Sequence, residues 1–290
     1  MIRFYVTFTL ISYFNMLNNI NNLPKIKYRP WVIMLLGTCA GFAFSFKVSG
    51  QISPPGLSDT RLASWMAIGL DQNISKDQSW SSVSYVGYGY MSNPHGRYNI
   101  FGKPSMFIFN EEVKKKLSQH VSLTGALSFR GQYLYNKQPP YHKATPGLKK
   151  EFRAYGKFTY HWNLHKTKWN IDFRPEFRRF FLPEYDADDT RHAIRTRFKV
   201  KSSIPLNEAE SQFLILSAES LFQNERTKAA GNSHWSGFFY DDSRFAIYFR
   251  YAPKDWPLYA DIGYMNNLAG KDPTYAMHHI AVDIMFRDLF

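Results

Sequence analysis

The sequence is nearly devoid of cysteine. Its single cysteine, Cys39, lies in an apolar stretch close to the N-terminus, and no other thiol follows it. If that stretch is removed, the mature chain has no thiol, which suits a protein that crosses an oxidising periplasm.

Long apolar runs are also missing beyond residue 50. The mean hydropathy is −0.38, and no downstream segment approaches the roughly 18 apolar residues that a helical membrane span requires. Yet aromatic residues make up 18% of the chain, with 25 Phe and 19 Tyr. This combination suits a barrel whose polar inner face offsets an apolar outer face.

The one long apolar run lies within residues 31–46, after Lys25, Lys27 and Arg29. The small residues Ser49 and Gly50 follow at cleavage positions. We therefore predict a signal peptide over residues 1–50, cleaved before Gln51, with residues 1–24 as an atypical N-terminal extension. Lipidation at Cys39 is the less favoured alternative, because Thr38 is large for the preceding residue. Residues 51–290 are predicted to form a single domain.

Acidic residues are scarce relative to basic ones, with 23 Asp and Glu against 36 Lys and Arg. Residues 1–50 hold five of the 36 basic residues and no acid, so the net charge of +13 falls to +8 after cleavage. No basic cluster is interleaved with a nucleic-acid motif, and we predict no nucleic-acid partner.

Residues 169–181 alternate between apolar and charged side chains, which is the period of a β-strand. One face carries Trp169, Ile171, Phe173, Pro175, Phe177 and Phe181, interrupted by Arg179. The other face carries Asn170, Asp172, Arg174, Glu176 and Arg178. A soluble strand would usually present Thr, Ser and Lys to water, whereas here a column of opposite charges opposes a face bulky enough to meet lipid.

The same two-sided pattern recurs in residues 149–164, 191–204, 242–252 and 276–287. It predicts an all-β fold, an antiparallel transmembrane β-barrel in the outer membrane of a Gram-negative cell. A large soluble all-β protein with amphipathic strands is the alternative.

Eleven segments have strand character, and short turns alternate with longer loops between them. The segments are 63–73, 82–91, 105–117, 120–135, 148–163, 168–181, 190–204, 210–223, 243–252, 257–268 and 275–287. The longer loops are predicted at 136–147, 182–189, 224–242 and 269–274. Because outer-membrane barrels usually have an even number of strands, we expect about twelve, with a short extra strand in 51–62, or alternatively ten.

Several short motifs give a family resemblance across residues 63–286. They are Trp65 with Trp80, Glu151-Phe-Arg153, Arg174-Pro-Glu-Phe-Arg178, Arg195-Thr-Arg-Phe-Lys199, Asp242-Ser-Arg244, Gly263-Tyr-Met265 and His278-His279. In these the chain resembles an uncharacterised outer-membrane β-barrel family, the domain of unknown function 2490. The resemblance implies the barrel and its location, and it brings no assigned reaction.

The inward faces predict an ionic network in a lumen that is richer in basic than in acidic residues. Arg130, Glu151 and Asp242 are further inward charges. The predicted network consists of Arg153, Arg174, Glu176, Arg178, Arg195, Arg197, Glu219, Arg244, Arg250, Asp261 and Asp283. If the lumen conducts, this porin-like barrel is a passive channel for small anionic solutes. If the charges pair across a narrow lumen, they plug it and leave a closed structural or interaction barrel.

An enzymatic role as a barrel lipase or deacylase would need a serine, a histidine and an acid at the outer rim. Ser217, Ser220, His278, His279 and Asp283 supply the residue types, but the sequence has no G-x-S-x-G elbow. His278 and His279 point to opposite faces of a strand and cannot hold one metal ion together. We therefore predict neither catalysis, nor a metal, nor a cofactor. Outer-membrane lipid and, through strand 275–287, the barrel-assembly machinery are the predicted partners.

Overall fold

The computed structural model describes residues 60–93, 99–136, 138–181, 192–229, 232–269 and 275–289. All of them belong to one compact unit that spans residues 50–290. The predicted signal peptide and the cleavage site before Gln51 lie outside the described residues. None of the described residues forms a helix long and apolar enough to cross a membrane.

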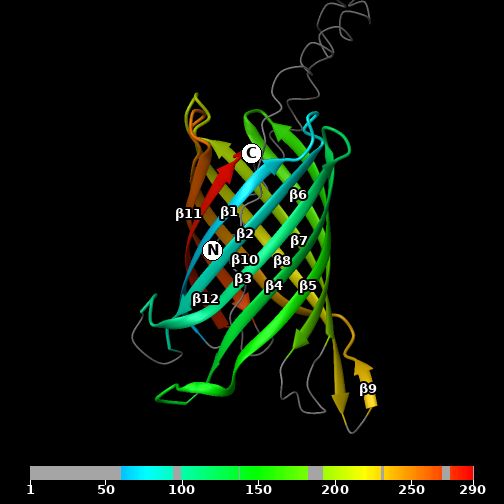
Figure 1. The fold of residues 1–290 in the computed structure, drawn as a ribbon, viewed down its shortest axis with the longest axis vertical. Helices are drawn as coiled ribbons and strands as arrows, with labels where there is room; N and C mark the ends of the chain where they lie inside the picture. The colour runs from blue at the N-terminus through cyan, green and yellow to red at the C-terminus, as the bar shows by residue number, and fades with distance from the viewer. Residues whose placement is uncertain are drawn as a thin grey trace, which may run out of the picture. The chain divides into compact units, whose positions relative to one another are not determined.

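The described residues form twelve strands in one sheet, which confirms the predicted all-β barrel of about twelve strands (Figure 1). The strands are β1 (Leu62–Asn73), β2 (Trp80–Met91), β3 (Lys103–Lys116), β4 (Val121–Tyr135), β5 (Lys143–Leu164), β6 (Thr167–Phe181), β7 (His192–Pro205), β8 (Gln212–Ala229), β9 (Asn232–Trp235), β10 (Phe239–Tyr251), β11 (Leu258–Ala269) and β12 (Tyr275–Arg287). They run obliquely around the barrel, as closure of a sheet requires.

Among the described strands, eleven close the barrel and β9 pairs only with β8. β8 continues the circuit by pairing with β10, and β1 closes it by pairing with β12 in parallel, from Leu62 opposite His278 to Asp71 opposite Arg287. Antiparallel neighbours alternate in direction, so an odd circuit must contain one parallel pair. The even number expected from other barrels therefore does not hold for the closed circuit.

The two ends of the barrel differ in their connections. Five short turns lie at one end of the described barrel, which we call the turn end: 74–79, 117–120, 165–166, 206–211 and 252–257. The opposite end, the loop end, receives the connection 92–102 and the β4–β5 connection, and β9 lies beyond it (Figure 1). Because β1 and β12 are parallel, the chain enters β1 at the loop end and leaves β12 at the turn end.

Several strands extend beyond the predicted segments, and β5 and β8 do so by the most residues. β5 begins at Lys143, where the sequence predicts a loop over 136–147, and β8 continues to Ala229 before pairing with β9. Both extensions lie at the loop end. There the backbone pairing between strands continues, although apolar and polar residues no longer alternate. The sequence pattern therefore predicts the part of each strand with an apolar outer face and misses the polar extension.

The inside of the barrel is divided into two sectors. Trp65, Met106, Tyr248, Tyr259 and Met285 form part of a buried apolar cluster, mainly on β1, β3 and β10–β12. The Trp65 ring lies against Gly87, where a Cβ atom would overlap it, so this position requires glycine. The charged side chains occupy the other sector, mainly on β4–β8 and β10.

Candidate functional site

The structure places the predicted network residues on the inner face of the barrel. Ten of the eleven are buried in the described structure, and the Arg174 side chain is 17% exposed. Period-two alternation accounts for this placement, because the neighbouring apolar residues are exposed on the outer face. Arg179, the exception in the alternation, points outward and lies over the Phe181 ring.

Glu176 on β6 is the centre of the ionic network, and its side chain is fully buried. Its Oε2 atom lies 2.7 Å from Arg174 Nη2 and 3.5 Å from Arg197 Nη2. Its Oε1 atom lies 3.6 Å from Arg178 Nε and 3.9 Å from Arg153 Nε. One carboxylate thus faces four guanidinium groups from three adjacent strands.

Glu151 on β5 is a second centre, toward the loop end. Arg153 donates hydrogen bonds to both of its oxygens, at 2.6 and 3.0 Å, and Arg178 donates one at 2.5 Å. Arg130 lies 3.9 Å from the same carboxylate. Since Arg153 and Arg178 also approach Glu176, the two centres belong to one network.

A third centre links β7 to β10. Glu219 lies 2.8 Å from Arg197 Nη1 and 3.9 Å from Arg244 Nη1, and Arg244 donates a 2.9 Å hydrogen bond to Asp242. Glu219 points into the barrel. It lies on the same face of β8 as Phe213, which is partly buried, and Ile215, which is buried.

Two members of the network are absent from the sequence prediction. Asp241 lies 2.6 Å from Arg195, and Gln223 accepts hydrogen bonds from Arg178 and Arg195. Gln223 lies on the same face of β8 as Glu219, so the alternation of residues along the strand could have identified it. Asp241 could not be identified in this way, because the register shifts between Tyr240 and Asp242 and a bulge interrupts the alternation there.

Three predicted members, Arg250, Asp261 and Asp283, make contacts of their own among the described residues. Arg250 donates hydrogen bonds of 2.7 and 2.6 Å to both oxygens of Asp261, its direct partner across β10 and β11, and lies over the Tyr259 ring. Asp283 accepts a 3.1 Å hydrogen bond from the Trp65 indole. Within the described residues these contacts lie beside the apolar sector.

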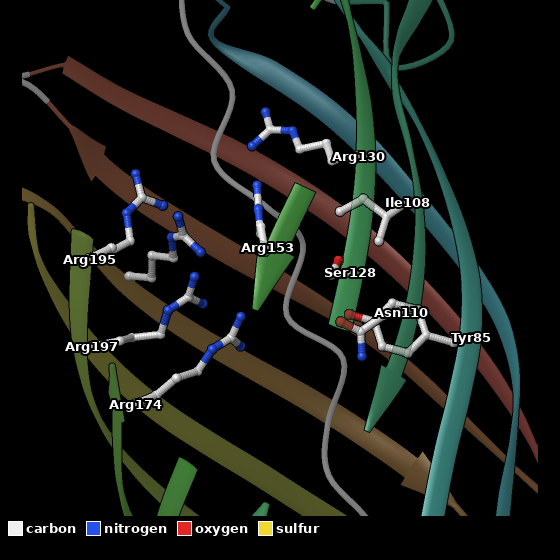
Figure 2. A pocket seen from close by; sticks show the side chains of 10 residues that line it. Tyr85, Ile108, Asn110, Ser128, Arg130, Arg153, Arg174, Arg195 and Arg197 are labelled. Atoms are coloured by element: carbon white, nitrogen blue, oxygen red, sulfur yellow. The ribbon is translucent and has the colours of Figure 1, made fainter. Parts of the chain in front are cut away.

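A small gap lies between the arginines of the network. It has a volume of about 30 Å³ and is lined by Arg130, Arg153, Arg174, Arg195, Arg197, Arg244, Tyr85, Ile108, Asn110 and Ser128 (Figure 2). A single water needs roughly 10–15 Å³ of such volume, so the gap holds about two waters.

The residue types considered for catalysis are divided between the two faces. His279 and Asp283 are buried inside the barrel, whereas the His278 ring accompanies Tyr264 on the outer face. Ser220 lies 3.4 Å from Ser243 on the outer face, while Ser217 shares the inward parity of Glu219. Within the described ranges, no group of three or more His, Cys, Asp or Glu side chains is placed to hold a metal ion.

Comparison with known proteins identifies a family and no characterised relative. The model of a family described as a protein of unknown function, DUF2490, matches residues 62–276. No curated protein and no solved structure matches the chain.

Proposed function

We propose that this chain, which belongs to the DUF2490 family of proteins of unknown function, is an outer-membrane β-barrel whose lumen is closed to solutes. It would act as a structural or interaction barrel through the surface at its loop end. One observation carries the proposal. Charged side chains pair with one another inside the barrel, whereas large apolar side chains are exposed on its outside.

The exterior presents large apolar side chains around the whole circuit. Each of the eleven barrel strands contributes at least one that is more than a third exposed, among them Met66, Val86, Phe109, Leu127, Phe158, Phe173, Phe198, Leu216, Ile247, Ile262 and Ile284. A soluble monomer rarely exposes an apolar patch above a few hundred Å². Strands of 12 or more residues also exceed the roughly 9–11 that cross a bilayer.

Aromatic side chains on the outer face gather toward both ends of the barrel, as membrane interfaces favour. At the turn end, Trp162 stacks on Trp169 at 5.8 Å and Trp256 contacts Tyr251. Toward the loop end, Tyr88 and Tyr90 lie 5.2 Å apart. This spacing supports a membrane between the two ends.

The orientation follows from the connection lengths, because outer-membrane barrels place short turns in the periplasm. The loop end, and with it the start of β1, would then face the outside of the cell. β12, which completes the wall between β11 and β1, would present the C-terminal strand to the assembly machinery from the periplasm.

Cysteine labelling tests this orientation. Arg61 is exposed at the loop end and Lys166 is exposed in the β5–β6 turn, and the chain's own Cys39 belongs to the predicted signal peptide. We expect a bulky, membrane-impermeant maleimide to label Arg61→Cys on intact cells, and Lys166→Cys only after the outer membrane is permeabilised. The reverse pattern would show that the barrel is inserted the other way round.

Conductance in a planar bilayer tests whether the lumen is closed. We expect purified wild-type protein to insert without conductance steps, because buried ion pairs fill the lumen around Glu151, Glu176 and Glu219. Co-flotation of the folded protein with the same lipids would establish insertion independently. Regular steps would contradict closure.

A passive channel for small anionic solutes is the second candidate. It is favoured by the gap lined by six arginines, since basic linings favour anions. The same recordings distinguish the two candidates, because a channel of this kind would show steps whose reversal potential in a salt gradient reports anion selectivity.

A further inference from the structure

A groove with a volume of about 560 Å³ lies on the outer face of the barrel, over β2–β6, which are neighbours in the sheet (Figure 1). Its walls include the exposed side chains of Trp80, Val113, Leu123, Phe158 and Phe173. The volume is within the range of roughly 300–1,000 Å³ that is typical of small-molecule sites. The groove is separate from the ionic network, whose side chains lie inside the barrel.

Two glycines form the floor of the groove. Gly125 on β4 and Gly156 on β5 are direct partners across the two strands, and both are exposed. A Cβ atom at Gly125 would meet no atom within 4 Å, and one at Gly156 would meet the Thr124 carbonyl oxygen at 4.0 Å. Contact with a protein neighbour therefore does not require either glycine. Glycine within a strand often marks a place where a ligand comes close to the backbone.

The groove extends from the turn end toward the middle of the barrel. Trp80 is the first residue of β2 and Lys115 lies next to the end of β3, both at the turn end, whereas Pro175 lies near the middle of β6. In a barrel that spans a membrane, this distance corresponds to the depth of one leaflet, or about half of the roughly 30 Å hydrocarbon core. A linear apolar chain that begins at the membrane surface matches this shape.

The mouth of the groove carries a positive charge. The Lys115 ammonium lies 4.9 Å from the centre of the Trp80 ring, and both residues are exposed. Within the described ranges Lys115 contacts that ring and forms no ion pair with a carboxylate. Glu111, on the same face of β3, accepts hydrogen bonds from the Ser82 and Ser84 hydroxyls on β2 instead. A negatively charged headgroup at the membrane surface would complement this lysine.

We infer that the groove binds one molecule of a diacyl phospholipid with a negatively charged headgroup. One acyl chain lies over Gly125 and Gly156, and the phosphate lies against Lys115 and Trp80. The inference rests on the proposed function, because it places the groove in a membrane. A symmetric pair of copies is a poorer occupant, since a two-fold axis along the membrane normal brings the two Lys115 side chains to the same depth, where they repel each other.

Native mass spectrometry of the purified, detergent-folded barrel tests this inference with phosphatidylglycerol and with phosphatidylcholine of the same chain length. Wild-type protein is expected to bind one phosphatidylglycerol, and to bind it more tightly than the zwitterionic lipid. Lys115→Gln should bind phosphatidylglycerol about five-fold more weakly, the usual contribution of one lysine near a membrane surface. Lys166→Gln also removes an exposed lysine at the turn end, but one that does not line the groove, and should bind like wild type.

Groove-filling variants test the place of the acyl chain. Gly125→Phe directs a ring into open space and should weaken the binding of both lipids at least ten-fold, and Gly156→Leu serves if this variant does not fold. Ala218→Phe adds the same ring at an exposed position on the outer face of β8, away from the groove, and should leave binding unchanged. The inference is overturned if wild type binds neither lipid, or if both groove-filling variants bind phosphatidylglycerol with unchanged affinity. It is also overturned if wild type forms dimers that these variants abolish, which would assign the groove to a second copy.

Binding in detergent does not depend on where the protein resides in the cell. A protein that binds the lipid in its groove but fractionates away from the outer membrane would contradict the proposed function and support the site. A protein of the outer membrane whose groove binds no lipid would contradict this inference alone.

Discussion

Replacing Glu176 by glutamine is expected to lower the free energy of unfolding by about 3–5 kcal/mol, the usual cost of breaking a buried ion pair from one side. The amide keeps the shape of the side chain but removes the charge that faces Arg153, Arg174, Arg178 and Arg197. The guanidinium groups would then be left buried with too little counter-charge. Reversible urea unfolding in lipid vesicles measures the effect.

Glu210→Gln is the matched control for this substitution. Glu210 lies 3.4 Å from Lys168 at the turn end, and its side chain is 29% exposed. Water and salt screen such a pair, so its loss should cost less than about 1 kcal/mol. A Glu176→Gln variant as stable as the control would show that the arginines do not depend on this carboxylate, which would contradict a lumen closed by the network.

Phe198→Arg is expected to destabilise the membrane-inserted barrel by about 2–4 kcal/mol, the cost of an arginine on the lipid face at the bilayer midplane. Phe198 lies near the middle of β7, is 48% exposed and has its ring centre 5.2 Å from that of Phe173. Unfolding from lipid vesicles gives the difference from wild type.

Leu206→Arg is the control for this substitution, because it places the same residue at an exposed turn position instead of a lipid-facing one. Leu206 lies in the turn after β7 and is 51% exposed, and arginine there should change stability by no more than about 0.5 kcal/mol. If Phe198→Arg were as mild as Leu206→Arg, the outer face would be in water, and the barrel would not span a membrane.

The inner and outer faces of most strands could be predicted from the sequence because charged and apolar residues alternate. β5, β6 and β7 carry most of their charges on one parity and mainly large apolar residues on the other, so register and face follow together. Alternation is weak in β1, where Ala63, Trp65 and Ala67 point inward while Met66 and Ile68 point outward. The apolar sector of the interior was therefore not predicted.

Features that depend on the partner strand could not be predicted in this way. The bulge that places Asp241 beside Arg195 changes which residues face inward. β1 and β12 pair in parallel through backbone hydrogen bonds. Backbone hydrogen bonds leave no recognisable pattern in the sequence of side chains. The eleven segments with strand character nevertheless correspond to the eleven barrel strands of the described structure.

Density-gradient separation of cell envelopes tests the central claim, that this barrel spans the outer membrane. The full-length chain would be produced in a Gram-negative host, and its distribution compared with markers of the inner membrane, the outer membrane and the periplasm. We predict that the protein sediments with the outer membrane and stays there after a high-salt wash. Recovery in the soluble periplasmic fraction or in the inner membrane would contradict the account.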